Sequence, residues 1–183
     1  MDLSIGCFRP IAIARNTDST IESSIRVLVV EDHEPFRQFA CSTLRKKAEF
    51  DVVCEVSDGL ETVRMAEKLQ PDLILLDVGL PSLNGIEAAR RIHKLVPKSK
   101  IVFLSQESPP VVVHAALSVG AQGYVVKTQA ESELLSAVGA AIRGKQFDSA
   151  VLGVQAPTGP TEDQARERHR LRKDFPNMPE ATD

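Results

Sequence analysis

Residues 73–85 read LILLDVGLPSLNG, and this stretch decides the fold. Its first four residues are apolar, which is typical of a strand buried on both faces of a parallel sheet. Asp77 follows the strand directly. Asn84 can then cap a helix, and Glu87 three residues further on resembles the second member of a capping box. A buried strand, an acidic residue and a helix start therefore follow one another in a single short segment.

The same alternation extends outward in both directions. Apolar runs of strand length occupy 25–30, 51–56, 73–76, 101–104 and 123–126, with segments of helical period between them. Helices are expected after Pro35, over about 59–69, from Asn84, near Pro109-Pro110, and from Thr128 with Glu131 three residues on. Five such units predict a doubly wound α/β fold around a parallel sheet with right-handed crossovers.

Composition limits the classes of protein to consider. The 183 residues are 43% hydrophobic and 26% charged, which is ordinary for a globular chain with one domain and flanking segments. The net charge of -3 gives no general sign of a nucleic-acid binder. Three cysteines without a C-x-x-C pair suggest neither a disulfide framework nor a zinc site, so a reducing cytoplasm fits best. We expect no membrane span, because no apolar run approaches about 20 residues. We expect no signal peptide, because the N-terminus lacks a basic region followed by an apolar one.

The regular pattern has clear limits along the chain. We interpret 1–24 as a flexible extension, 25–148 as the domain, and 149–183 as a linker-like tail that is disordered or partly helical. The tail carries a basic cluster, but acidic residues interleave with it, which favours a solvated segment over a nucleic-acid arm. The cluster consists of Arg166, Arg168, Arg170, Arg172 and Lys173.

Polar side chains follow four of the expected strands. Glu31 and Asp32 follow the first, Asp77 the third, Ser105 the fourth and Lys127 the fifth. The carboxyl ends of parallel strands meet at one edge, where such sheets bind ligands. Two carboxylates about 4 Å apart repel by about 4 kcal/mol at an effective dielectric near 20. Mg²⁺ relieves that repulsion, and a cation beside an amine suits a phosphoryl group.

With these motifs in order, residues 25–144 resemble response-regulator receiver domains of two-component signalling. The resemblance implies a flavodoxin-like, five-stranded (βα)5 sheet. It rests on four motifs at strand ends, each weak alone. These are Val29-Val30-Glu31-Asp32-His33, the run from Leu75 to Gly85, Leu104-Ser105, and Gly123-Tyr124-Val125-Val126-Lys127.

The resemblance also implies roles for single residues. Asp77 would accept a phosphoryl group from a sensor histidine kinase or a phosphotransfer protein. Asp32, Asp77 and the backbone carbonyl of Gly79 would bind Mg²⁺, with Glu31 acting mainly through a water. Lys127 would pair with the phosphoryl oxygens. Ser105 would bond to them, and Tyr124 would switch a protein-interaction face. The expected chemistry is self-phosphorylation and self-dephosphorylation only, in a signalling domain and not an enzyme.

Two residues depart from the common family pattern. Thr128 stands directly after the lysine, where many members of the family have proline. Receivers that are joined to LuxR-type DNA-binding domains commonly lack this proline too. Gln106 is larger than the alanine or glycine common after the serine, and would narrow access to the phosphoryl group. A DNA-binding domain of that type needs roughly 60 residues and a packed core, and too few apolar residues follow position 150. We therefore expect no specific DNA binding by this chain. The partners we expect are an unidentified downstream protein and a second copy of the chain, in a homodimer.

Competing interpretations remain open at this point. The chain could be a truncated LuxR-type transcriptional regulator. It could also be a magnesium-dependent phosphatase of the haloacid-dehalogenase type, although that would want a second acid two residues after Asp77, where Gly79 stands. Taken singly, each residue has an ordinary structural explanation. Asp77 could be a loop residue, Ser105 a residue of a turn, Lys127 a solvated surface cation and Tyr124 a core residue that only packs. Only their joint placement at strand ends favours the receiver.

Overall fold

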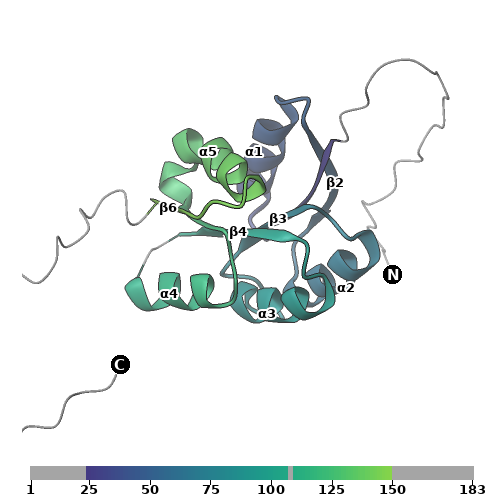
Figure 1. Cartoon of the computed structure of the whole chain (residues 1–183), viewed down its shortest axis with the longest axis vertical. Coiled ribbons are helices and arrows are strands. Elements are labelled where there is room, and N and C mark those ends of the chain that lie inside the picture. Colours follow the sequence, from purple (N-terminus) through teal and green to yellow (C-terminus); the bar gives the residue numbers. More distant parts are fainter. Residues whose placement is uncertain (1–23, 107–108, 150–183) are drawn as a thin grey trace, which may run out of the picture. The chain divides into compact units, whose positions relative to one another are not determined.

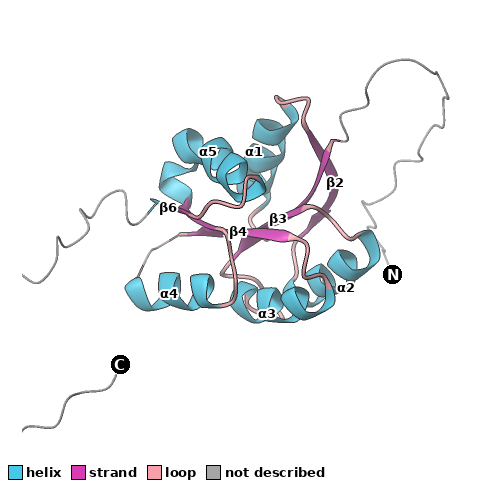
Figure 2. Cartoon of the chain, in the orientation of Figure 1, coloured by secondary structure: helices cyan, strands magenta, loops and turns pink. Residues whose placement is uncertain are grey.

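The structure is a computed structural model, and it describes residues 24–106 and 109–149. Strands and helices alternate along the chain (Figures 1 and 2). The strands are β1 (Ile25–Val30), β2 (Phe50–Val56), β3 (Leu73–Asp77), β4 (Lys100–Ser105), β5 (Gly123–Val126) and β6 (Phe147–Asp148). The helices are α1 (Glu34–Arg45), α2 (Gly59–Leu69), α3 (Gly85–Leu95), α4 (Pro110–Ser118), the short 3₁₀ turn η1 (Lys127–Gln129) and α5 (Ala130–Ile142).

The sheet has the order β2-β1-β3-β4-β5-β6, and all its neighbouring strands are parallel. Helices α1 and α5 cover one face, and α2, α3 and α4 cover the other (Figure 1). From β1 the chain adds β2 on one side, and it then crosses back to add β3 and the later strands on the other side. Strands β1 and β3 are therefore neighbours at the point where the strand order reverses. A doubly wound sheet binds its ligands at such a reversal, beyond the carboxyl ends of the strands. The α/β fold class predicted from the sequence is confirmed.

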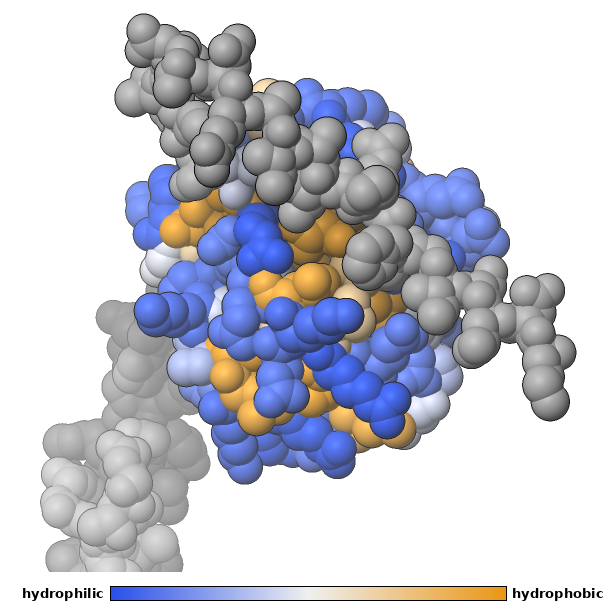
Figure 3. Space-filling view, turned by 90° about the vertical axis from the view of Figure 1, so that its right-hand side faces the viewer, coloured by the Kyte–Doolittle hydropathy of each residue, from blue (hydrophilic) through white to orange (hydrophobic). Residues whose placement is uncertain are grey.

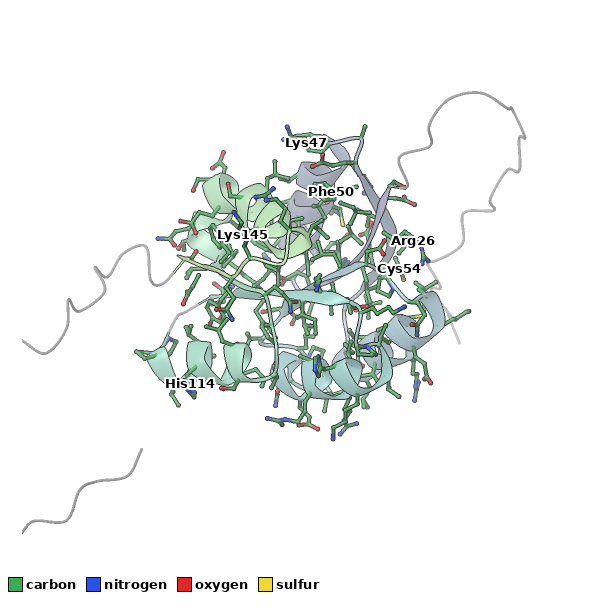
Figure 4. The ribbon with its side chains drawn as sticks, viewed as in Figure 1. Arg26, Lys47, Phe50, Cys54, His114 and Lys145 are labelled. Carbon is green, nitrogen blue, oxygen red and sulfur yellow. The ribbon has the colours of Figure 1, made fainter. Side chains whose placement is uncertain are left out.

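Two apolar cores explain the continuous apolar runs in the central strands. Leu28 and Val30 of β1 face the α2, α3 and α4 layer, while Val27 and Val29 face α1 and α5. All four side chains are fully buried, as expected for a strand covered on both faces. Figure 4 shows side chains filling the space between the sheet and both helical layers, with His114 on the outer side of α4.

Three local details differ from the sequence-based expectation. A sixth strand, β6, follows α5 and pairs with β5, which the sequence did not predict because two residues carry no apolar period. Helix α5 begins at Ala130 and not at Thr128, because η1 tightens the chain after β5. Asn84 caps α3 by accepting a hydrogen bond from the Glu87 amide at 2.9 Å. The Glu87 carboxylate bonds to Arg90 and Arg91 of its own helix and does not complete a capping box.

The start of α3 packs directly on the backbone at the end of β3. A Cβ atom added to Gly85 would lie 2.0 Å from the carbonyl oxygen of Asp77, well inside contact distance. Glycine is therefore required at this position by close approach of two backbone segments. The same contact fixes the peptide of Asp77 against the first turn of α3.

The expected flanking segments fall almost wholly outside the described residues. The extension over 1–24 is described only at residue 24, and the tail only at Ser149, so their expected character stays a prediction. Ser149 is buried, accepts a hydrogen bond from the Val126 amide at 3.3 Å, and donates one to the Glu133 carboxylate. No helix in the described ranges has the length and apolar character needed to cross a bilayer. Figure 3 shows one side of the domain, where hydrophobic residues alternate with hydrophilic ones in patches.

Candidate functional site

The carboxyl ends of β1, β3, β4 and β5 open into one pocket of about 520 Å³. The sequence predicted that the side chains following four strands would meet at this edge, and Asp32, Asp77, Ser105 and Lys127 line the pocket. Glu31, the fifth of these residues, is fully buried and hydrogen-bonded to Lys127. Gly79, which the family resemblance implied, lines the pocket too. Gln106 lines it as well, next to Ser105. The remaining lining residues are His33, Val78, Pro109 and Val112.

Lys127 joins two of the three acids at this edge. Its Nζ atom donates hydrogen bonds to Oδ2 of Asp77 and to Oε1 of Glu31, each at 2.8 Å. The side chain of Lys127 is only 6% exposed, and those of Glu31 and Asp77 are 0% and 5% exposed. Nζ also lies 5.1 Å from the centroid of the Phe36 ring, in cation–π range. An ammonium held this way is a fixed positive charge beside the Asp77 carboxylate.

Burial and charge act in opposite directions on these groups. Burial raises the pKa of Glu31, repulsion from Asp77 adds to that rise, and the hydrogen bond and charge of Lys127 oppose it. Burial would lower the pKa of Lys127, but its hydrogen bonds to Asp77 and Glu31 outweigh this and raise that pKa. Lys127 therefore stays protonated at neutral pH and compensates the buried negative charge.

The three acids form a cluster with spare ligand capacity. One oxygen each from Glu31, Asp32 and Asp77 lies within 4.8 Å of the others. Oε2 of Glu31 is buried and receives no hydrogen bond among the described residues, although Lys127 Nζ lies 2.8 Å from it. The Asp32 side chain is exposed and forms no hydrogen bond or ion pair with the described residues. Carboxylate oxygens at this spacing fit a hard divalent cation such as Mg²⁺.

Gly79 lies beside the Asp77 carboxylate. Its amide donates a hydrogen bond to Oδ1 of Asp77 at 3.2 Å. A Cβ atom at this position would lie 3.9 Å from Oδ2, so a side chain here would project next to that carboxylate. The glycine leaves that side of the pocket without the second acid that a phosphatase of this fold would need.

Ser105 and Tyr124 lie on the neighbouring strands β4 and β5. Ser105 lines the pocket and is 8% exposed, whereas Tyr124 is fully buried. Burial raises the pKa of Tyr124, and a hydrogen bond with the Ser105 side chain opposes that rise. Tyr124 lies in the apolar core between the sheet and helices α2, α3 and α4, on the strand next to that of Ser105.

Sequence reasoning missed two contacts around the site. The ring of Phe36, in the first turn of α1, lies 5.1 Å from the ammonium of Lys127. Arg37, one residue later, donates to the carbonyl oxygen of Glu31 at 2.7 Å. Neither contact leaves a signal in the sequence, because an aromatic and an arginine near a helix start are ordinary.

Comparison with known proteins decides the family. The model of the response regulator receiver domain family matches residues 27–139. The chain belongs to this family. The receiver assignment drawn from the strand-end motifs is thereby confirmed, and with it the placement of the chain among two-component response regulators.

Several curated proteins align with this receiver. It is 34% identical over 126 residues to the transcriptional regulatory protein DegU of Brevibacillus brevis, covering 69% of this chain and 53% of that protein. It is 35% identical over 130 residues to the transcriptional regulatory protein LiaR of Bacillus subtilis, covering 70% of this chain and 62% of that one. The chain thus spans about half to three fifths of these relatives.

Solved structures agree with the fold. The response regulator domain of Thermotoga maritima CheB is 30% identical, with a TM-score of 0.62, over 66% of this chain and 97% of that domain. The signal receiver domain of the putative response regulator NarL from Mycobacterium tuberculosis is 29% identical, with a TM-score of 0.62, over 67% and 98%.

Proposed function

We propose that this receiver is a phosphoacceptor switch in which Asp77 takes a phosphoryl group from the phosphohistidine of a sensor histidine kinase or of a phosphotransfer protein. The observation that carries the proposal is the Asp77 carboxylate, buried at the pocket and bonded at 2.8 Å to the Lys127 ammonium within a cluster of three acids. The donor protein would meet this receiver in the cytoplasm.

The transfer is a displacement at phosphorus. A carboxylate oxygen of Asp77 forms a bond to phosphorus, the phosphorus–nitrogen bond of the donor breaks, and its electron pair returns to the imidazole nitrogen. No oxidant or reductant is needed. Lys127 offsets the negative charge on the phosphoryl oxygens, and its contact with Asp77 already places the ammonium there.

Asp32, Asp77 and Glu31 are the residues that would hold Mg²⁺, with the backbone carbonyl of Gly79 as a further ligand. When bound, the ion would offset the charge of the acids and of the phosphoryl oxygens. The exposed carboxylate of Asp32 faces the open pocket, so it would bind directly. Glu31 is fully buried behind Lys127 and would act mainly through a water.

The output face in this proposal consists of α4, β5 and α5. Ser105 would move toward the phosphoryl group, and the Tyr124 ring would occupy the space it leaves. Amide exchange compared with and without beryllofluoride, a phosphoryl mimic, tests this placement. Protection should change in residues 105–142. A change confined to other parts of the chain would move the switch elsewhere.

The partners follow from the same proposal. A kinase or phosphotransfer protein donates the phosphoryl group, an unidentified protein reads the switched face, and two copies of the chain could pair through it. The transcriptional activity named for DegU and LiaR belongs to those longer proteins. For this chain we propose signalling through protein contacts, without specific DNA binding of its own.

The test is phosphorylation by acetyl phosphate with Mg²⁺, followed by measurement of intact mass. The wild-type chain should gain one phosphoryl group, and Asp77→Asn should gain none. Asp51→Asn, which changes an exposed aspartate of β2, is the matched control and should behave as wild type. An unchanged adduct in Asp77→Asn would refute the assignment. Sustained hydrolysis of unrelated phosphate esters would instead favour the phosphatase.

A further inference from the structure

Arg37 connects helix α1 to the acidic cluster without lining the pocket. Its Nη1 atom donates a hydrogen bond of 2.7 Å to the backbone carbonyl oxygen of Glu31. That carbonyl belongs to the peptide that joins Glu31 to Asp32. Because the peptide is planar, holding its oxygen also sets the direction in which the chain enters Asp32.

Asp32 depends on its backbone for its position. Its carboxylate is exposed and bonds to no described side chain. The Glu31 amide is already fixed on the sheet side, by a 2.9 Å hydrogen bond to the carbonyl of Val56. Arg37 therefore supplies a second contact to the backbone of Glu31, at its carbonyl oxygen, where the chain leaves β1 and enters the pocket.

We propose that Arg37 is a positioning residue for the metal site, which orients Asp32 and Glu31 for Mg²⁺ through the Glu31 carbonyl. The inference rests on the proposed function, since it concerns the same acidic cluster. A charged donor to a backbone carbonyl makes one of the stronger hydrogen bonds in proteins, and its loss loosens the ligands that it orients. Residues that orient metal ligands in this way change metal affinity by about 10- to 100-fold when they are removed.

A purely structural role predicts something different. Arg37 also lies 3.8 Å from Glu55 of β2, so it could simply fasten α1 to the sheet edge. Arg45 makes a shorter contact with the same carboxylate, 2.8 Å from Nη2 to Oε1, and does not contact Glu31. Arg45 is therefore a matched control: it shares the fastening contact and lacks the contact with the site.

The experiment compares the full chain with Arg37→Met, Arg37→Lys and Arg45→Met. Methionine keeps an unbranched apolar side chain and removes the donor, whereas lysine keeps a charged donor. The dissociation constant for Mg²⁺ is measured by titration calorimetry, and unfolding in urea is measured with a chelator present. The rate of phosphorylation by acetyl phosphate is then followed at increasing Mg²⁺ concentration.

We expect the Mg²⁺ dissociation constant of Arg37→Met to rise about 10-fold. Arg37→Lys should lie between Arg37→Met and wild type, and Arg45→Met should stay within about twofold of wild type. The phosphorylation rate of Arg37→Met should approach the wild-type value once Mg²⁺ saturates the site, because Asp77 and Lys127 are untouched. If Arg37→Met does not fold, the Arg37→Lys comparison with Arg45→Met decides alone.

Three results would overturn the inference. Mg²⁺ affinity could be unchanged in both Arg37 variants, Arg45→Met could lose as much affinity as Arg37→Met, or the rate of Arg37→Met could stay low at saturating Mg²⁺. Each of these leaves the proposed function intact, provided that the wild-type chain binds Mg²⁺ and is phosphorylated. A wild-type chain that binds no Mg²⁺ would overturn the proposed metal site itself, and the inference with it.

Discussion

Lys127→Met should destabilise the folded chain, because Lys127 compensates two buried carboxylates. Methionine keeps an unbranched apolar side chain of similar length and removes only the ammonium. Glu31 is 0% exposed and the Asp77 side chain 5%, so both carboxylates are largely shielded from water. In the variant the two negative charges would face each other unpaired.

The size of the effect follows from the geometry. Ligand oxygens of Glu31 and Asp77 lie within 4.8 Å of each other. Two unit charges at about that distance repel by about 3.5 kcal/mol at an effective dielectric near 20. Breaking a buried ion pair by removing one partner typically costs about 3–5 kcal/mol, so we expect a loss of that size in the free energy of unfolding.

Urea unfolding at pH 7 with a chelator present, followed by circular dichroism, measures this loss. Lys68→Met changes an exposed lysine of α2 and should stay within about 0.5 kcal/mol of wild type. Adding Glu31→Gln to Lys127→Met removes one of the two facing charges and should recover about 3 kcal/mol. A loss below about 1 kcal/mol, or no recovery in the double variant, would refute the idea that Lys127 compensates buried charge.

Two further predictions concern the backbone at Asp77 and the buried thiol of α1. Gly85→Ala should lower the free energy of unfolding by about 1–3 kcal/mol and slow phosphorylation, because the new Cβ would lie 2.0 Å from the Asp77 carbonyl oxygen. Gly139→Ala in α5 is the control, because the atoms nearest to its new Cβ belong to the flexible Arg143 side chain. It should be neutral or stabilising when unfolding in urea is measured. Equal losses of stability in Gly85→Ala and Gly139→Ala would contradict the proposed clash at Asp77. Burial raises the pKa of Cys41 from 9.0 to about 12, so iodoacetamide at pH 8 should label Cys41 only after unfolding, as read by peptide mass spectrometry. Between pH 9.0 and about 12 the Cys41 thiol stays protonated in the folded chain and loses its proton in the unfolded chain. The contribution of Cys41 to the free energy of unfolding should therefore be lost as pH rises through this range. Rapid labelling of Cys41 in the folded chain would contradict its burial.

The sequence predicts most of this fold because its local signals agree with one another. Buried parallel strands leave apolar runs, and Pro35, Pro110 and Asn84 stand at or beside helix starts. The five long strands were expected within a residue or two of their observed bounds. Strand β6 could not be predicted, because Phe147 and Asp148 are held by pairing with β5 and not by a periodic pattern. Ser149, at the start of the expected tail, is buried by two polar contacts that no composition rule reveals.

The candidate site was predictable for a topological reason. Parallel strands bring their carboxyl ends to one edge, so Asp32, Asp77, Ser105 and Lys127 could be placed together from order alone. What order could not supply is the depth of burial that separates the fully buried Glu31 from the exposed Asp32. The contact of Arg37 with Glu31 could not be predicted either. Every residue has a backbone carbonyl, so the residue type at position 31 does not indicate that its carbonyl accepts a side-chain hydrogen bond.

The central claim is that Asp77 itself carries the phosphoryl group. Borohydride reduces an aspartyl phosphate to homoserine, so peptide mass spectrometry of the phosphorylated and reduced chain locates the acceptor. We expect homoserine at position 77, dependent on both acetyl phosphate and Mg²⁺. Homoserine at another aspartate, or none at position 77 in a chain that has gained a phosphoryl group, would contradict it.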